Sequence, residues 1–250
     1  MTNRPDLTAS FNADDFYVVT TEPGYLEESL PVWTCKRPGA IEFSDIDKRT
    51  IKRLNCEDVP GAWQLHDVLS TDECDRLVEL SNALGYHGDA PVSLPRSVRH
   101  NDNFTWVVDE SVDGPIWERC KDFFETSSYT SLRPRGLNAR FRFYRYGTGD
   151  YFAPHADGAW PGSRIINGQL VHNAYGDRIS EMTLLIFLTD GYTGGRTMFQ
   201  TQGGGLVGVA TPKGAMLCFP HGSNPQHCIH AGEAVTSGHK YIIRTDILFG

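Results

Sequence analysis

The pattern of apolar and polar positions changes from helical spacing in the first half of the chain to short strand-like runs in the second. Ser70 and Glu73 form a capping box, and apolar residues follow at helical spacing until Gly85, so a helix is expected to begin at Ser70. A second helix is expected to start after Asp113, with Pro115 in its first turn and an apolar stripe behind it.

From residue 138 onward, short apolar runs alternate with glycine-containing turns, which is typical of β-strands. The expected strands are Ala139–Tyr146, Met182–Leu188, Thr197–Gln200, Leu206–Ala210, Ala215–Phe219 and Tyr241–Phe249. Helices followed by many short strands predict an α+β protein whose helices pack on a closed or double-layered antiparallel sheet. Residues 1–60 have weak periodicity, so we expect an irregular N-terminal extension packed on a single domain of residues 61–250.

Composition narrows the class of protein without identifying its function. The 250 residues are 40% apolar and 22% charged, as in soluble globular proteins, and the net charge of −8 does not favour nucleic-acid or anionic-membrane partners. No apolar run has the roughly 18 residues of a membrane span, and no secretory signal is recognisable, so we expect a cytoplasmic protein. The sequence does not indicate an oligomeric state.

The tripeptide from His155 to Asp157 is a candidate metal-binding element. In an extended chain, residues i and i+2 project to the same side, so the imidazole and the carboxylate can bind one ion. This pair suits iron(II), manganese or zinc. Such a tripeptide is common by chance, and the alternative is a histidine beside an acid in a surface loop.

The C-terminal segment from residue 227 to residue 244 favours a metal site, because it offers a third ligand from a distant part of the chain. Its strand carries Lys240 and Arg244 on one face, with Ile242 between them. A cation buried in a barrel needs an anionic partner, which a carboxylated co-substrate would supply. The alternative is that both cations lie on an exposed strand face.

At this point four blocks of the sequence together resemble a known family. They are Arg142–Tyr146 with Tyr151–Gly158, Thr183–Asp190 with Gly194–Phe199, Pro212–Gly214, and the pattern H-x-G-x-x-V-x-x-G-x-K from His230 to Lys240. Their order and spacing resemble the 2-oxoglutarate- and Fe(II)-dependent dioxygenases, in particular the prolyl 4-hydroxylase-like branch, over residues 62–250. The resemblance implies a double-stranded β-helix of the jelly-roll or cupin-like kind with flanking α-helices.

The resemblance also implies roles for individual residues. The catalytic metal ligands would be His155, Asp157 and His230; His221 and His227 are rivals for the third position, and the motif favours His230. The residues expected to bind 2-oxoglutarate are Lys240, Tyr146, Arg244 and Thr183. Lys240 matches the family's basic residue for the far carboxylate. Arg244 stands where an aromatic residue is more usual, and the alternatives for it are the same role, substrate binding or a pair with Asp246.

Candidate substrate contacts come from three places in the sequence. They are Arg142 and Tyr144, which share the strand face of Tyr146, Arg99 and Asn103 in a segment whose position resembles a substrate-covering loop, and His227 beside the third ligand. A polar insertion at residues 158–177 follows the first two ligands and is a further candidate for substrate selection. The remaining histidines, among them His172, have no motif context and are interpreted as surface or structural residues.

The implied reaction uses Fe(II), 2-oxoglutarate and O2, with ascorbate as an optional reductant, and releases succinate and CO2 while a C–H bond is hydroxylated. Without a secretory signal, a small molecule such as an amino acid or a secondary metabolite is favoured as substrate over a prolyl residue of a peptide or protein. Two hypotheses from other classes of protein function remain. One is a zinc-dependent hydrolase that uses the same three ligands, and the other is a catalytically silent β-barrel binding protein.

Overall fold

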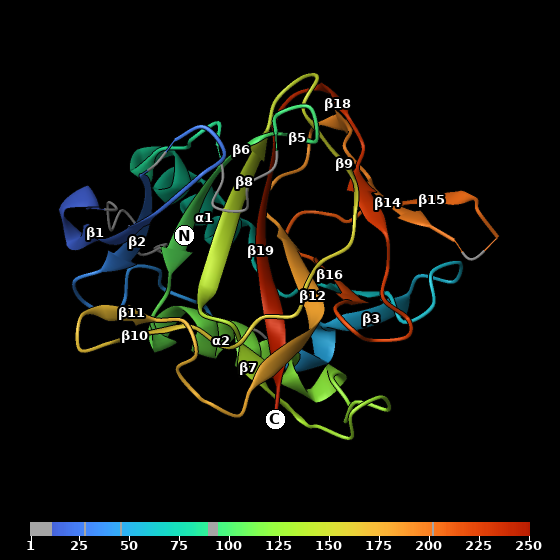
Figure 1. Ribbon diagram of the computed structural model, residues 1–250, viewed down its shortest axis with the longest axis horizontal. Coiled ribbons are helices and arrows are strands. Elements are labelled where there is room, and N and C mark those ends of the chain that lie inside the picture. Colours follow the sequence, from blue (N-terminus) through green and yellow to red (C-terminus); the bar gives the residue numbers. More distant parts are fainter. Residues whose placement is uncertain (1–11, 28, 46, 90–94, 202) are drawn as a thin grey trace, which may run out of the picture.

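The computed structural model describes residues 12–27, 29–45, 47–89, 95–201 and 203–250. Their strands form two main sheets that face each other (Figure 1). The ten-stranded sheet contains, in spatial order, β1 (Phe16–Glu22), β2 (Leu30–Cys35), β6 (Asp102–Val107), β8 (Arg140–Tyr146), β19 (Lys240–Phe249), β12 (Ile179–Phe187), β16 (Met216–Pro220), β4 (Trp63–His66) and β3 (Lys52–Asn55), with β7 (Pro134–Leu137) paired to the end of β19.

The second sheet is smaller and has five strands. Its order is β15 (Leu206–Val209), β14 (Thr197–Gln200), β17 (His230–Gly232), β9 (Tyr151–His155) and β5 (Arg99–His100). Two short ribbons complete the described strands, namely β10 (Arg164–Ile166) with β11 (Gln169–Val171), and β13 (Thr193–Gly194) with β18 (Val235–Ser237). All six strands that the sequence predicts are present, so the α+β, double-layered arrangement is confirmed.

Two α-helices, α1 (Thr71–Leu84) and α2 (Glu110–Cys120), lie behind the large sheet in Figure 1. Three short 3-10 helices, η1 (Ala13–Asp15), η2 (Lys48–Thr50) and η3 (Lys121–Phe123), complete the described helical segments. No helix in the described part of the chain is long and apolar enough to cross a membrane.

Side chains that alternate along the central strands divide the interior into two cores. Because successive strand residues point to opposite faces, β8, β12 and β19 contribute to both cores. The core against the helices includes Leu77, Ile116, Phe141, Phe143, Leu184, Ile186 and Ile243. The core between the two sheets includes Tyr144, Tyr146, Leu185, Phe187, Phe199, Phe219 and Ile242. The face of the large sheet that carries Tyr144 and Tyr146 is therefore the inner face of the barrel.

Three expectations about local structure need correction. The second helix begins at Glu110 rather than after Asp113, because Asp109 accepts a hydrogen bond from the Ser111 amide and caps it; Pro115 lies inside the helix. Residues 1–60 are not irregular where they are described, since β1, β2 and β3 extend the large sheet. The segment with Arg99 and Asn103, whose position resembles a substrate-covering loop, includes β5 and the start of β6.

The first helix begins as predicted and is tied to the rest of the molecule by a buried ion pair. Ser70 and Glu73 form the capping box. The Glu73 carboxylate also accepts hydrogen bonds from Arg119 at 2.8 and 2.9 Å and from the Ser44 amide at 2.7 Å. Burial alone would raise its pKa, but these donors hold the pKa of Glu73 at about 2. The pair joins α1, α2 and the N-terminal segment.

Replacing Arg119 with methionine is expected to reduce the free energy of unfolding by about 3–5 kcal/mol, because Glu73 would be left buried and unpaired. Urea denaturation measures this change. Glu118→Gln is the control: its carboxylate is 55% exposed and pairs with Lys121 at the surface, so a change within about 0.5 kcal/mol is expected. Equal losses in the two variants would contradict the role of the buried pair.

Candidate metal centre

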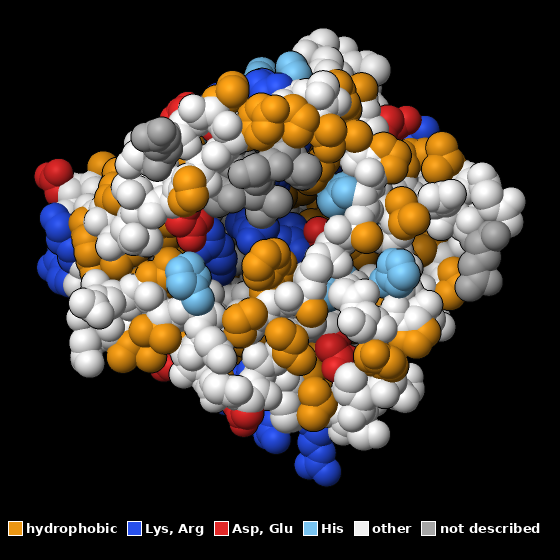
Figure 2. Space-filling view, viewed as in Figure 1, with side chains coloured by type: hydrophobic (Ala, Val, Ile, Leu, Met, Phe, Trp, Pro, Cys, Tyr) orange, Lys and Arg blue, Asp and Glu red, His pale blue; other side chains and the backbone are white. Residues whose placement is uncertain are grey.

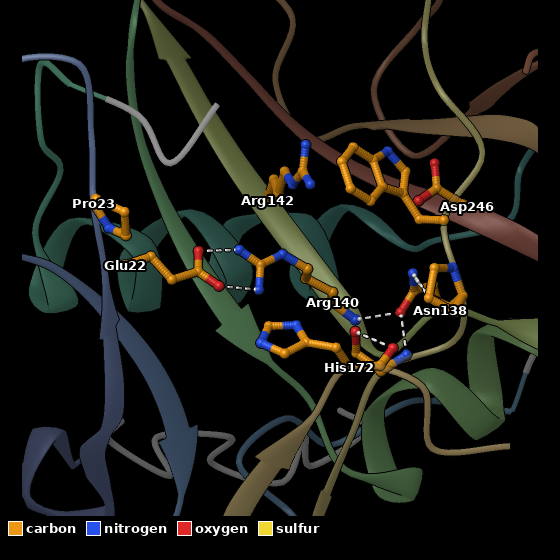
Figure 3. A pocket seen from close by; sticks show the side chains of 10 residues that line it. Glu22, Pro23, Asn138, Arg140, Arg142, His172 and Asp246 are labelled. Carbon is orange, nitrogen blue, oxygen red and sulfur yellow. Dashed lines mark hydrogen bonds and ion pairs between the residues drawn. The ribbon is translucent and has the colours of Figure 1, made fainter. Parts of the chain in front are cut away.

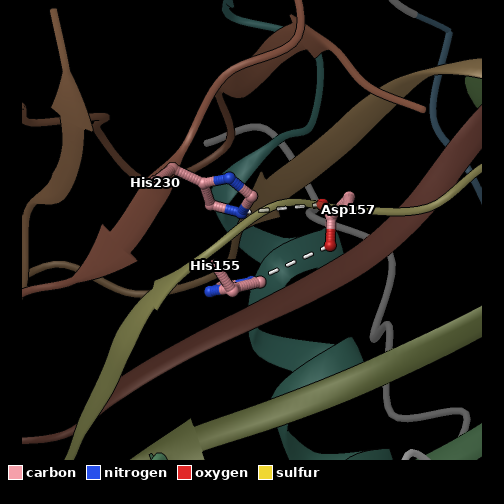
Figure 4. Close-up of side chains that lie close together, drawn as sticks. All are labelled: His155, Asp157 and His230. Carbon is pink, nitrogen blue, oxygen red and sulfur yellow. Dashed lines mark ion pairs between the residues drawn. The ribbon is translucent and has the colours of Figure 1, made fainter. Parts of the chain in front are cut away.

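The pairing of β9 with β17 brings two histidines from distant parts of the chain together. His155 and His230 are directly opposite each other in this antiparallel register. Asp157 follows two residues after the end of β9. One ligand atom from each of the three side chains lies within 4.8 Å of the others. Figure 4 shows the three side chains converging on one point. His230 is therefore placed where the sequence predicts the third ligand.

Hydrogen bonds at the far side of each ring orient the two imidazoles. Nδ1 of His155 lies 2.9 Å from the Ala153 carbonyl oxygen, and Nδ1 of His230 lies 3.1 Å from that of Cys228. A ring whose Nδ1 donates to a carbonyl presents Nε2 as a neutral ligand. Burial lowers the pKa of both imidazoles, that of His155 to about 4. Both rings are therefore neutral near pH 7, as metal binding requires.

Asp157 is held as a carboxylate by its surroundings. Its oxygens lie 3.8 Å from Nε2 of His155 and 3.6 Å from Nε2 of His230. Its Oδ2 also accepts hydrogen bonds from Thr183 at 2.7 Å and from Nε of Arg244 at 3.3 Å. Burial alone would raise the pKa of Asp157, but the Arg244 guanidinium and the two imidazoles hold it well below its usual range.

A chain of polar groups supports the carboxylate from behind. The Thr183 hydroxyl, which donates to Asp157, lies 2.8 Å from Nδ1 of His221, and Nε2 of His221 lies 2.9 Å from the Ser180 hydroxyl. The Ser180 oxygen in turn accepts from the Trp160 amide at 2.9 Å. Each group can donate once and accept once if His221 is neutral with its proton on Nδ1. Both ring nitrogens of His221 are thus occupied, so it positions Asp157 rather than binding the metal.

The donor set fits a divalent metal. Two neutral imidazoles and one carboxylate from two adjacent segments form the facial arrangement typical of non-haem iron(II) sites, and they leave coordination positions open. Phe152 stacks on His155 with ring centroids 3.7 Å apart, and Phe219 packs against His230 at 4.5 Å. These aromatic walls fix the rings on one side, so further ligands would enter from the barrel interior.

Lys240 lies in the same pocket as the two histidines and is almost completely buried, with 2% of its surface exposed. Its ammonium group donates to the Gly195 carbonyl at 2.6 Å and lies 5.2 Å from the ring centres of Tyr146 and Phe187. No ion pair joins it to a carboxylate of the described residues. Burial lowers its pKa to about 8. The alternative of an exposed strand face is therefore wrong for this residue.

Arg244, also predicted to be near the co-substrate, is already paired. Its guanidinium lies between Asp157 and Asp246, with an Nη–Oδ distance of 3.1 Å to Asp246. Burial alone would lower its pKa, but the two carboxylates raise it above its ordinary value. Tyr146 lines the pocket beside Lys240, whereas Thr183 does not line it and contacts Asp157 from behind.

Three predicted substrate contacts, Tyr144, Arg142 and Arg99, lie at the inner face of β8. The Tyr144 hydroxyl accepts a hydrogen bond from Arg99 at 2.6 Å, and the Arg99 guanidinium stacks over the rings of Tyr144 and Phe152. Burial alone would raise the pKa of Tyr144, but Arg99, Arg142 and Arg244 lower it. Three guanidinium groups thus surround this tyrosine, and the interior near the triad is strongly cationic.

The other two predicted contacts are not brought to the pocket. The Asn103 side chain donates to the Asp89 carbonyl at 2.7 Å, so its amide is used in a contact with the backbone. His227 is exposed, and its Nδ1 lies 3.2 Å from the Asn224 carbonyl. Conversely, His172 and Trp160, which the sequence did not single out, line a cavity next to the site. Both belong to the polar insertion at residues 158–177, and the position of this insertion after the first two ligands was the only feature of the sequence that indicated them.

Comparison with known proteins gives matches in structure only. No family model and no curated protein matches the chain. A viral collagen prolyl hydroxylase from Paramecium bursaria Chlorella virus-1, solved with 2-oxoglutarate, is 19% identical with a TM-score of 0.50 and covers 75% of this chain and 96% of that chain. A Pseudomonas putida prolyl-4-hydroxylase is 13% identical with a TM-score of 0.51, covering 75% and 92%.

A third match is a prolyl hydroxylase from Trichoplax adhaerens in complex with a hypoxia inducible factor peptide fragment. It is 14% identical with a TM-score of 0.52 and covers 75% of this chain and 83% of that chain. At these identities the likeness concerns the fold. The chain therefore has the double-stranded β-helix fold of the prolyl hydroxylase structures, and the predicted fold class is confirmed.

Replacing Thr183 with valine is expected to weaken Mn2+ binding about 10- to 100-fold, because Asp157 loses the hydroxyl that orients it. Asp157→Ala is expected to abolish binding. Both are measured by calorimetry on purified protein. Thr34→Val is the matched control, since Thr34 is also buried and donates to a backbone carbonyl, at 2.9 Å, far from the triad. Unchanged Mn2+ affinity in Thr183→Val would show that the hydroxyl does not support the ligand.

Proposed function

We propose that this protein is an Fe(II)- and 2-oxoglutarate-dependent dioxygenase that hydroxylates an unactivated C–H bond of a small molecule, with release of succinate and CO2. The observation that carries the proposal is the His155–Asp157–His230 group together with a buried lysine in the pocket that the two histidines line, inside a double-stranded β-helix. A zinc hydrolase would need the three ligands but would have no use for the buried ammonium group.

In this proposal, Lys240 binds the far carboxylate of 2-oxoglutarate. Its ammonium group has two N–H donors beyond the one that Gly195 accepts, and burial without a carboxylate partner is unfavourable for a cation. The free volume of this pocket is about 30 Å³, so the side chains that line it must move outward when the dicarboxylate binds. Arg244 keeps Asp157 ionised and correctly oriented, rather than acting as the anchor.

The residues around the triad would also control the reaction environment. Iron with 2-oxoglutarate and O2 would supply the oxidising chemistry once bound, and ascorbate would keep the iron reduced. The chain itself contributes orientation through the two Nδ1–carbonyl hydrogen bonds and the Thr183–Asp157 contact. The aromatic rings of Phe152, Phe219 and Tyr146 exclude water from the space where a substrate C–H bond must approach.

A peptide substrate is the second candidate. It is favoured by the match to the Trichoplax adhaerens prolyl hydroxylase, whose structure contains a peptide fragment. A small molecule is preferred because the cavity next to the triad has a volume of about 310 Å³ and combines charged side chains with apolar surface, which fits a compact ligand with a charged group.

Purified protein incubated with Fe(II), ascorbate and labelled 2-oxoglutarate is expected to release labelled CO2. Asp157→Ala should reduce the release to background, because the proposed triad loses its one carboxylate ligand. Thr34→Val, which lies away from the site, should behave as wild type. An absence of CO2 release across a broad substrate panel, together with tight zinc binding, would favour the hydrolase instead.

The affinity for 2-oxoglutarate should depend on pH through Lys240. Its ammonium form, which binds the carboxylate, predominates below its pKa of about 8 and is lost as the pH rises, so the Kd should increase by up to tenfold per pH unit above about pH 8. Lys240→Met should raise the Kd at every pH and remove this dependence. Calorimetry on Mn2+-loaded protein measures both effects. A silent Lys240→Met together with a damaging Arg244→Met would make Arg244 the anchor.

A further inference from the structure

A second, larger cavity lies beside the metal centre and is not explained by the binding of iron or 2-oxoglutarate. Its volume is about 310 Å³, within the range of small-ligand sites, and its walls include Glu22, Arg140, Arg142, Trp160, His172 and Asp246 (Figure 3). Side-chain contacts link its wall to the metal centre: Asp246, which lines the cavity, pairs with Arg244, and Arg244 also contacts Asp157. In Figure 2 this face of the molecule is hollowed near its centre, with Lys or Arg side chains in the hollow.

Two arginines of β8 face this cavity, and they differ in charge compensation. Arg140 forms a two-pronged ion pair with Glu22, one contact of which is 2.7 Å. Arg142 forms no hydrogen bond or ion pair with any residue that the structure describes, and in Figure 3 no dashed line reaches it. The one carboxylate near it, Asp246, is already paired with Arg244 at 3.1 Å. Arg142 is therefore the uncompensated cation of the cavity wall.

The surroundings of Arg142 make this lack of a partner costly. Burial, and then the positive charge of Arg244, lowers the pKa of Arg142 to about 10. The Trp160 ring, whose centre is 5.9 Å from the guanidinium carbon, gives cation–π attraction but accepts none of the five N–H donors. A half-buried guanidinium with unused donors is a site for a planar anion, which it can bind with two parallel hydrogen bonds.

This anion is not 2-oxoglutarate bound to Lys240. On the paired strands β8 and β19, Lys240 is opposite Tyr146 and Arg244 is opposite Arg142. Four residues of strand therefore separate the backbone positions of the two cations, roughly 13 Å at the usual rise per residue. The five-carbon co-substrate is shorter than this distance and must also reach the metal ligands. The two cavities have different lining residues, so they can hold two different molecules.

We propose that the primary substrate is a small organic acid whose carboxylate is bound by Arg142, with its apolar part against Trp160. The inference rests on the proposed dioxygenase function and adds the chemical class of the substrate. A carboxylate is favoured over a phosphate because Glu22 and Asp246 also line the cavity and a single uncompensated guanidinium balances one negative charge. Arg142 thus acts as the substrate's anchor, as Lys240 does for the co-substrate.

The test compares acids with their own neutral amides. A panel of free L-amino acids and small monocarboxylic acids, and the primary amides of the same compounds, is titrated into protein saturated with Mn2+ and 2-oxoglutarate, where no turnover occurs. Binding is followed by calorimetry and by the shift in Tm. At least one acid is expected to bind about 10- to 100-fold more tightly than its amide, the effect of a hydrogen-bonded charge pair.

Variants of Arg142 test whether this residue causes the difference in affinity between acid and amide. Arg142→Gln should weaken binding of that acid by the same factor and remove the difference from the amide, whereas Arg142→Lys should retain part of it. Arg145→Gln is the matched control, since Arg145 lies on the same strand, points to the other face and pairs with Asp102 at 2.8 Å. It should bind the acid as wild type does.

Several results would overturn the inference: equal binding of acids and amides, an unchanged affinity in Arg142→Gln, or CO2 release stimulated only by a proline-containing peptide blocked at both ends. Binding by inorganic phosphate alone would make the ligand a phosphate instead. Failure of Mn2+ and 2-oxoglutarate to bind would contradict the proposed function separately. The acid–amide comparison is therefore repeated on metal-free protein, where the cavity and Arg142 are still present.

Discussion

The pairing of β9 with β17 is the interaction on which the site depends. It places His155 opposite His230 although the two are far apart in the chain, and it leaves Asp157 just beyond the strand end, where its carboxylate turns back toward both rings. Hydrogen bonds from the two Nδ1 atoms to backbone carbonyls then fix Nε2 as the free donor atom on each ring. Strand register therefore sets the ligand geometry, and the large sheet supplies the supporting groups.

The cationic side chains on the inner face of β8 and β19 are of two kinds, those paired with a carboxylate and those without one. Arg244 is neutralised by Asp157 and Asp246, and Arg140 by Glu22. Lys240 and Arg142 have no carboxylate partner among the described residues, and they lie at different levels of the same face, in different cavities. Buried cations of this kind are unfavourable unless anions bind, so the two positions account for the proposed acidic co-substrate and the proposed acidic substrate.

Local rules in the sequence predicted much of this architecture. The Ser70–Glu73 capping box and the six strands depend on short-range patterns, and each is present. The triad was predicted from the resemblance of four separated blocks to a known family, and the fold brings its three side chains together. The start of α2 was missed because Pro115 is a strong signal for a first turn, yet Asp109 provides the cap. The roles of His172 and Trp160 could not be predicted, since only the folding of their insertion against β8 makes them cavity walls.

The central claim, that the triad and the adjoining pocket bind iron together with 2-oxoglutarate, is tested most directly by an anaerobic titration of Fe(II)-loaded protein with 2-oxoglutarate. Chelation of iron(II) by a 2-oxo acid produces a visible charge-transfer absorption. The account predicts that this absorption appears, saturates at one equivalent and is absent when Asp157 is replaced by alanine. Iron-loaded protein that shows no such absorption at saturating 2-oxoglutarate would contradict it.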